Sequence, residues 1–374
     1  MSTNLQQSII VVAGDPGGAK AVVPVVEVLL SETGYRVQSL LYREAQDVWA
    51  KHGLAFEQLD ESTSTADAER ILTNSQAQLL VAGTSYNGID LEKKFITAAR
   101  KLGVPSLAVL DFWSNYATRF SDEEGKLAHL PDRIAVMDAV ARDEMVAAGF
   151  DPTQLVITGQ PALDDLITYK ESHASEHRAA LRLAFGVSET DRLVLFASQP
   201  LASVFGDSAE QPLYLGYTET IVLDALVNAL ESIAKSHSER ITLLIRPHPR
   251  ENSKTFEERR SSSIRIINNP EGDSREMVLA SDLVAGMTTM LLVEACFLGV
   301  PVVSLQPGLR TTDPLPTNRT GLSRRVDSIN EFAPVIEGLL FDEKVRQKTI
   351  AKLAQAVPPG NAAQYVARLI GSML

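Results

Sequence analysis

Short apolar runs alternate with longer segments of helical pattern along most of the chain. Most of the runs are rich in Val, Ile and Leu on both faces, which is typical of parallel strands covered by helices on each side. The first series of runs comprises 8–14, 36–42, 79–84, 106–111, 133–137 and 154–159. The second series comprises 193–198, 241–246, 264–268, 283–286 and 301–305. This alternation predicts an α/β fold with two doubly wound, Rossmann-like parallel sheets.

The two series are separated by a polar segment of helical pattern, 168–192. A chain of 374 residues with 45% hydrophobic composition exceeds one ordinary core, so two domains are expected. We therefore place the domain junction after Asp165. The prediction is a first domain over 1–165 and a second domain over 166–360.

The C-terminal end carries a second break in the pattern, at Pro358, Pro359 and Gly360. An amphipathic segment, 361–374, follows this break. We expect this segment to be a helix that crosses back and packs on the first domain.

The charge and cysteine content exclude several classes of protein. A formal net charge of −12 argues against a nucleic-acid-binding surface, which needs a broad positive face. The single cysteine, Cys296, cannot form an internal disulfide, and its apolar neighbours predict a buried position. The N-terminus lacks a signal-peptide pattern, and no apolar run reaches the roughly 18 residues of a membrane span. We expect a cytoplasmic protein with no transmembrane segment, and the oligomeric state stays open.

Two loops of the first domain follow predicted strands, where open α/β sheets bind their ligands. The first contains Asp15, Gly17 and Gly18 and opens a helix, so the backbone could approach a ligand closely. It departs from the G-x-G-x-x-G fingerprint, so NAD is not indicated, and a plain tight turn is the alternative. Asp15 is either a base or a helix cap. The second loop, Asp111–Tyr116, is crowded with polar and aromatic residues and is either the wall of a ligand site or a structural plug.

Two loops of the second domain carry groups suited to phosphate. Ser198 follows the first strand of this domain, where a short hydroxyl side chain suits a phosphate contact. Arg246, His248 and Arg250 stand within five residues on a loop stiffened by two prolines. Guanidinium and imidazole groups at a strand end favour a phosphate partner, although a packed or solvated histidine is the alternative.

A third segment of the second domain combines Gly286, Thr288 and Thr289 with Glu294. The strand ends at Gly286, and either threonine can cap the helix that follows, whose free N–H groups form an anion site. Glu294 lies one to two turns into the helix, where a carboxylate can accept the two hydroxyls of a ribose. The alternative is an ordinary capped helix with Glu294 in solvent.

This segment, with the Arg246-Pro247-His248-Pro249 loop, resembles the donor site of glycosyltransferases with the GT-B fold. It is also similar to the non-hydrolysing UDP-N-acetylglucosamine 2-epimerases and the CDP-glycerol glycerophosphotransferases of surface-carbohydrate synthesis. The resemblance implies two Rossmann-like domains that face each other across a cleft, with a nucleotide-activated sugar between them. It further implies that Arg246, His248, Thr288 and Thr289 hold the diphosphate and that Glu294 holds the ribose.

We therefore expect metal-independent glycosyl or related group transfer from a UDP or CDP donor to a carbohydrate or small-molecule acceptor. Arg246 and His248 would stabilise the charge that develops on the leaving diphosphate. The acceptor needs a base, for which Asp111 is the first candidate, Asp15 the second and His129 the third. The Gly14 and Asp111 loops depart from the epimerase pattern, which favours a transferase. The alternatives are a UDP-sugar 2-epimerase or hydrolase and a sugar-nucleotide-binding protein without turnover.

Overall fold

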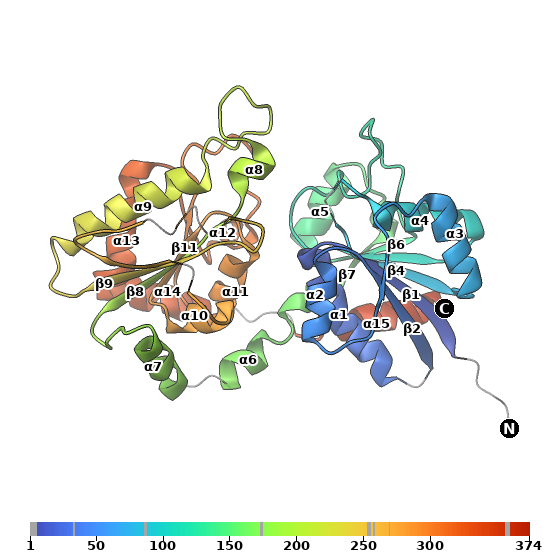
Figure 1. The fold of residues 1–374 in the computed structure, drawn as a ribbon, viewed down its shortest axis with the longest axis horizontal. Helices are drawn as coiled ribbons and strands as arrows, with labels where there is room; N and C mark the ends of the chain where they lie inside the picture. Colours follow the sequence, from blue (N-terminus) through green and yellow to red (C-terminus); the bar gives the residue numbers. More distant parts are fainter. Residues whose placement is uncertain are drawn as a thin grey trace. The chain divides into compact units, whose positions relative to one another are not determined.

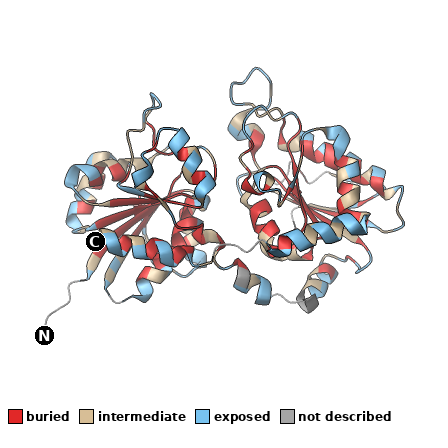
Figure 2. Cartoon of the chain, turned by 180° about the vertical axis from the view of Figure 1, so that it is seen from behind, coloured by how far each residue is buried: buried red, intermediate tan, exposed pale blue. Residues whose placement is uncertain are grey.

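The structure, a computed structural model, describes residues 6–32, 34–85, 88–172, 175–252, 256, 259–268, 270–355 and 360–374. The chain divides into two compact units, Met1–Asp165 with Pro359–Leu374, and Leu166–Pro358. Each unit is built on its own parallel sheet with helices on its faces (Figure 1). Figure 2 shows the strands of each sheet as the buried centre of its unit. The predicted α/β class with two parallel sheets is confirmed.

The first unit contains a seven-stranded sheet in the order β3-β2-β1-β4-β5-β6-β7. Its strands are β1 (Gln7–Ala13), β2 (Tyr35–Leu41), β3 (Glu57–Gln58), β4 (Leu79–Ala82), β5 (Ser106–Val109), β6 (Arg133–Val136) and β7 (Leu155–Ile157). Its helices are α1 (Pro16–Ser31), α2 (Ala45–Lys51), α3 (Thr65–Asn74), α4 (Leu91–Leu102), α5 (Ala139–Ala147) and α15 (Ala362–Met373). The strand order reverses between β1 and β4, which is where such sheets bind their ligands.

Both faces of the central strand β1 are buried, which explains its unbroken apolar run. Ile9 and Val11 join one cluster with apolar residues of α1 and α15. Ile10 and Val12 join a second cluster with α3 and α4. A strand covered on both faces has no polar side, as the sequence pattern indicates.

Helix α15 packs against α1 in the first unit, although the second unit lies between them in sequence. Val366 and Ile370 are fully buried in the same cluster as β1. The carboxylate of Asp164 accepts hydrogen bonds from the backbone N–H groups of Ala362, at 3.0 Å, and Ala363, at 2.7 Å. This carboxylate satisfies donors that the first turn of a helix leaves without partners. The predicted break at Pro358 and Pro359 lies outside the described residues.

The second unit contains a six-stranded sheet in the order β10-β9-β8-β11-β12-β13. Its strands are β8 (Arg192–Ala197), β9 (Ile241–Arg246), β10 (Arg265–Asn268), β11 (Leu283–Gly286), β12 (Val302–Leu305) and β13 (Arg324–Val326). Its helices are α6 (Leu166–Ser172), α7 (Ser175–Ala184), α8 (Leu201–Phe205), α9 (Glu219–Ala234), α10 (Ser274–Ala280), α11 (Met290–Leu298), α12 (Pro316–Arg319), α13 (Phe332–Phe341) and α14 (Glu343–Gln355). Here the strand order reverses between β8 and β11.

Two strands were not predicted. Strand β3 has two exposed residues, and strand β13 begins with two arginines, so neither carries an apolar run. Each is an edge strand, paired with β2 and β12 respectively, and tertiary pairing rather than local pattern selects it. No helix in the described part of the chain is long and apolar enough to cross a membrane.

Candidate functional site

In the second unit, the three segments that the sequence predicts to contact phosphate each follow one of three neighbouring strands. Strands β9 and β11 both pair in parallel with β8, so the segments that follow these three strands leave the same edge of the sheet. They carry Ser198, His248 and Thr288, and this edge includes the reversal of strand order between β8 and β11. The topology thus brings together the residues that the sequence placed at separate strand ends.

Ser198 and His248 are joined by Glu251, a residue that sequence reasoning did not single out. The Ser198 hydroxyl donates to Oε1 of Glu251 at 2.7 Å, and the His248 backbone N–H donates to Oε2 at 2.5 Å. Burial raises the pKa of Glu251 above its ordinary value, against hydrogen bonds that lower it, and Glu219 raises it further. One half-buried carboxylate therefore connects the loops after β8 and β9.

The His248 loop is a tight turn in which the backbone N–H of Glu251 donates to the carbonyl of His248 at 2.8 Å. The imidazole Nδ1 accepts a hydrogen bond from the Arg250 backbone N–H at 3.1 Å. With Nδ1 as an acceptor, the neutral ring carries its proton on Nε2, which is then a donor.

Thr288 and Gln199 connect the two strands at the reversal point. The Gln199 side-chain oxygen accepts from the Thr288 backbone N–H at 2.8 Å and from its hydroxyl at 3.2 Å. Thr289 caps α11 by accepting from the Leu291 N–H, and Gly299 ends the helix in a left-handed conformation. The predicted capped helix over this segment is confirmed.

Arg246 is half-buried near Gly272 and Asp273, whereas Gly286 is enclosed between strands. The half-buried Arg246 guanidinium donates to the Gly272 carbonyl at 3.3 Å, and burial lowers its pKa while Asp273 opposes the change. Gly286 is fully enclosed: a Cβ there would meet the Ala197 carbonyl oxygen at 2.9 Å. Packing between strands therefore requires glycine at 286, which gives a structural reason for a residue predicted to contact the ligand.

Glu294 is buried rather than solvated. Its carboxylate accepts from Nε of Arg275 at 2.7 Å, and the two side chains are 8% and 19% exposed. The Arg275 guanidinium in turn lies 5.4 Å from the ring centre of Tyr169. The solvent alternative for Glu294 is wrong, and a ligand that takes this carboxylate would share it with Arg275.

In the first unit, Asp111 is held by two partners from its own unit. The Arg119 guanidinium lies 2.5 Å from Oδ1 of Asp111, and the Thr84 hydroxyl donates to the same oxygen at 2.8 Å. The other oxygen, Oδ2, lies against Gly17, where an added Cβ would collide with it. Asp111 and Gly17 are therefore neighbours, and Gly18 packs closely on the Gly83–Thr84 backbone.

The aromatic rings of the Asp111–Tyr116 loop are packed inside the unit. Trp113 is 6% exposed and donates to the Asp138 carboxylate at 2.7 Å. Tyr116 is 9% exposed and donates to Glu144 at 2.6 Å. Of the two alternatives for this loop, the wall of a ligand site and a structural plug, the burial of both rings inside the unit favours the plug.

Asp15 occupies the N-cap position of α1, but its side chain makes no capping hydrogen bond. The backbone N–H of Asp15 donates to the Ser85 hydroxyl at 2.8 Å, and that hydroxyl donates to Glu92. Tyr42 also donates to Glu92, at 2.5 Å. Burial raises the pKa of Glu92 to about 7, despite these hydrogen bonds. A buried acid thus supports the loop that carries Asp15.

His129, the third base candidate, lies against α4, where its Nδ1 is 2.9 Å from the Thr97 hydroxyl. Burial and Lys93 lower its pKa. Cys296 is fully buried, as predicted, and burial raises the pKa of its thiol to about 12. Within the described ranges, no group of three or more His, Cys, Asp or Glu side chains is arranged to hold a metal ion.

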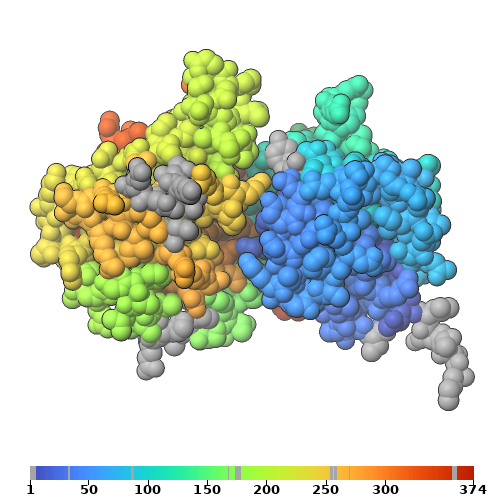
Figure 3. Space-filling view, in the orientation of Figure 1, coloured from blue at the N-terminus to red at the C-terminus, as the bar shows by residue number. Residues whose placement is uncertain are grey.

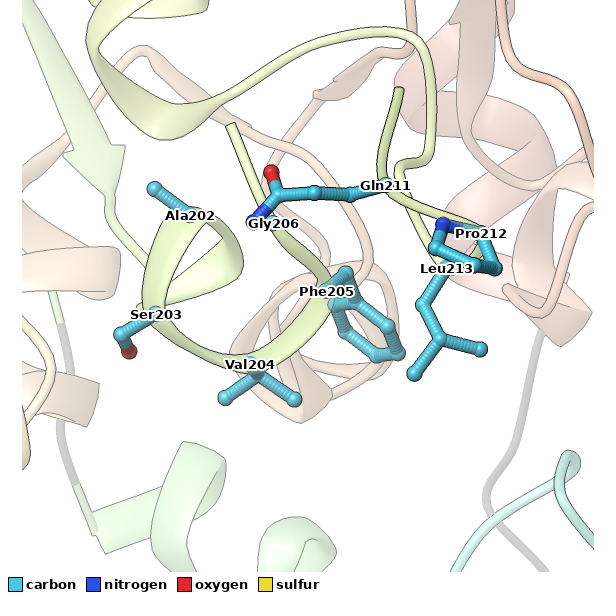
Figure 4. Close-up of a pocket in the computed structure, with 8 residues that line it drawn as sticks. All are labelled: Ala202, Ser203, Val204, Phe205, Gly206, Gln211, Pro212 and Leu213. Carbon is cyan, nitrogen blue, oxygen red and sulfur yellow. The ribbon is translucent and has the colours of Figure 1, made fainter. Parts of the chain in front are cut away.

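A hollow of about 290 Å³ lies between α8 and the segment that follows it, with Phe205 and Leu213 among its walls (Figure 4). Figure 3 shows this segment standing out from the surface of the second unit. None of the candidate site residues lines the hollow, so it does not mark the donor loops.

Sequence reasoning missed the partners of the candidate residues, namely Gln199, Glu251, Arg275 and Glu92. A weak signal existed for Glu92, which stands on an otherwise apolar helix face beside Leu91. The other three lie in polar loops or at a helix end, where the sequence alone distinguishes none of them.

Nearly the whole chain resembles several solved structures at low sequence identity. The UDP-N-acetylglucosamine 2-epimerase of Neisseria meningitidis, bound to UDP-GlcNAc, has a TM-score of 0.68 at 13% identity over 98% of this chain and 100% of its own. HepE of Anabaena, in complex with UDP and glucose, has a TM-score of 0.66 at 14% identity over 98% and 100%. MurG of Acinetobacter baumannii has a TM-score of 0.60 at 14% identity over 98% and 99%.

The fold is of the GT-B type. It is the two-domain α/β fold of these epimerases and of GT-B glycosyltransferases, as the sequence resemblance predicted. No protein-family model matches the chain, and no curated protein matches it in sequence. At such low identity the likeness establishes the fold, and the activity rests on the residues themselves.

Proposed function

We propose that the protein transfers a glycosyl or related group from a nucleotide diphosphate donor, with the donor held by the second unit. The observation that carries this proposal is the meeting of three donor-bearing segments at one sheet edge, after β8, β9 and β11. Ser198, His248 and the start of α11 supply hydroxyl, imidazole and backbone N–H groups. These groups suit the distributed charge of a diphosphate.

In this proposal the leaving diphosphate is stabilised without a metal. The Nε2–H of His248 and the guanidinium of Arg246 would donate to its oxygens as the bond to the transferred group breaks. Glu294 would accept the ribose hydroxyls. Asp111, whose Oδ2 faces Gly17, is the preferred base for the acceptor, and Asp15 is the second choice.

Calorimetry with UDP, CDP, uridine and pyrophosphate tests the donor site. Replacing Arg246 with Ala should weaken binding of both nucleoside diphosphates and pyrophosphate by about 1.5–3 kcal/mol, the scale of a charged hydrogen bond. Arg250→Ala is the matched control, because Arg250 carries the same charge four residues further along the chain but is exposed on the turn after β9. Equal losses in both variants, or a parent that binds none of these ligands, would contradict the assignment.

Turnover separates the three candidate activities. UDP- and CDP-sugars are incubated with and without carbohydrate acceptors, and free nucleotide is measured. Release that depends on an acceptor supports transfer, and release without one indicates hydrolysis. Conversion of the sugar without net nucleotide release indicates 2-epimerisation, which the UDP-GlcNAc-bound relative from Neisseria makes the second candidate. Binding without any product indicates a non-catalytic role.

A further inference from the structure

In the loops proposed to hold the diphosphate, the Ser198 hydroxyl and the His248 backbone N–H already have a partner inside the protein. Glu251 accepts from the Ser198 hydroxyl and the His248 backbone N–H, at 2.7 and 2.5 Å. Gln199 accepts from the N–H and hydroxyl of Thr288. Buried N–H and O–H groups need hydrogen-bond acceptors, and here the side chains of Glu251 and Gln199 supply them. A phosphate oxygen that takes the same donors must displace these side chains.

Glu251 is the costlier of the two acceptors to retain beside a diphosphate, because it carries a negative charge. Its carboxylate is half-buried, and among the described residues no Lys or Arg side chain forms an ion pair with it. The neighbouring carboxylate of Glu219 adds repulsion. Two anions cannot share the same pair of donors, and their repulsion is strong at a half-buried site.

We propose that Glu251 is an internal stand-in for the donor diphosphate: its carboxylate accepts from the Ser198 hydroxyl and the His248 N–H, and it must leave them when a diphosphate binds. This inference rests on the proposed function. It makes Glu251 a residue that lowers the affinity for diphosphates, so that removal of its charge improves binding. A residue that merely supported the loop would have the opposite effect.

The test is calorimetry of Glu251→Gln against the parent, with UDP, pyrophosphate and uridine as probes. The amide keeps the shape but accepts more weakly, so UDP and pyrophosphate should bind about five- to thirtyfold more tightly, the difference between charged and neutral hydrogen bonds. Uridine lacks the diphosphate and should bind as to the parent.

Glu219→Gln is the matched control. It removes the same charge close by, but the Glu219 carboxylate accepts from the Ala202 N–H at 2.9 Å and not from the proposed donors. Its effect on UDP should stay below about threefold, as expected for screened charges. Should Glu251→Gln fold poorly by circular dichroism, Glu251→Asp retains the charge but shortens the reach, and it should bind UDP more tightly than the parent.

The outcomes separate the two proposals. Weaker or unchanged UDP binding by the Glu251 variants, with a parent that binds UDP, overturns the stand-in role alone. An equal gain in Glu219→Gln also overturns it, since the effect would then be general charge. If neither the parent nor the variants bind UDP or pyrophosphate, the donor site itself is wrong and this inference is overturned with it.

Discussion

Replacing Glu92 with Gln should change the pH dependence of the first unit's stability. The Glu92 side chain is 3% exposed and accepts hydrogen bonds from Ser85 and Tyr42. Through Ser85 it supports the backbone N–H groups of Gly14 and Asp15. Gln resembles the protonated acid, because each offers one hydrogen-bond acceptor and one donor. In both cases the side chain at position 92 can donate to the Tyr42 oxygen, the reverse of the hydrogen bond that the carboxylate accepts.

The magnitude follows from the raised pKa. Burial, opposed by the hydrogen bonds, raises the pKa of Glu92 from 4.5 to about 7. Between these values the folded protein binds a proton that the unfolded chain has released, so this contribution to stability is complete below pH 4.5. It is lost as the pH rises through 7. At 1.36 kcal/mol for each pKa unit, the contribution is about 3 kcal/mol.

Urea unfolding followed by tryptophan fluorescence measures this effect in the right unit, because both tryptophans, Trp49 and Trp113, lie in the first unit. At pH 5 the parent and Glu92→Gln should be similar in stability. At pH 8 the variant should be more stable by up to about 3 kcal/mol. Glu123→Gln, which removes the charge of an exposed carboxylate, should show no such divergence. A stability difference between parent and Glu92→Gln that is constant with pH would refute the reasoning.

Three further predictions concern the candidate site. Glu294→Ala should weaken the binding of UDP and uridine in calorimetry but leave pyrophosphate nearly unaffected, and an equal loss for pyrophosphate would contradict the ribose assignment. Arg275→Ala strands the Glu294 carboxylate, so the second unit should lose up to about 3 kcal/mol in urea unfolding followed by circular dichroism, and unchanged stability would show the pair to be dispensable. Gly17→Ala drives a Cβ into the Asp111 carboxylate and should abolish turnover while UDP binding persists. Gly34→Ala, where an added Cβ meets no atom within 4 Å, is its control, and equal activity in the two variants would remove Asp111 from the mechanism.

Most of the fold could be predicted from the sequence, because parallel strands buried on both faces consist of continuous apolar runs. Strands β9 and β11 match their predicted runs residue for residue, since both faces of each are covered. Strands β3 and β13 could not be predicted, because their pairing with β2 and β12 depends on residues distant in sequence. Local pattern is informative only where burial is continuous along the strand.

The candidate site was also predicted only in part. Positions that follow a strand, such as Ser198 and Thr288, could be predicted because sheet topology alone brings them to one edge. Contacts across long separations could not: Tyr42 and Glu92 are 50 residues apart, and Ser198 and Glu251 are 53 apart. The sequence left the Asp111–Tyr116 loop as either a ligand wall or a plug for a related reason, since Trp113 is held by Asp138, a contact that the loop sequence does not encode.

In each unit, a serine hydroxyl near the loop after the first strand is hydrogen-bonded to a glutamate. In the first unit, Ser85, which follows β4, accepts from the backbone N–H of Asp15 after β1 and donates to the buried Glu92. In the second unit, Ser198, which follows β8, donates directly to the half-buried Glu251. The difference in depth decides the consequence. Glu92 is 3% exposed, so we expect its charge to affect the stability of the first unit. Glu251 accepts directly from the Ser198 hydroxyl, so under the proposal above its charge would act on the affinity for a diphosphate. Buried N–H and O–H groups need acceptors, so under the proposal above the affinity for a diphosphate would be the difference between its hydrogen bonds and those of the internal acceptor that it replaces.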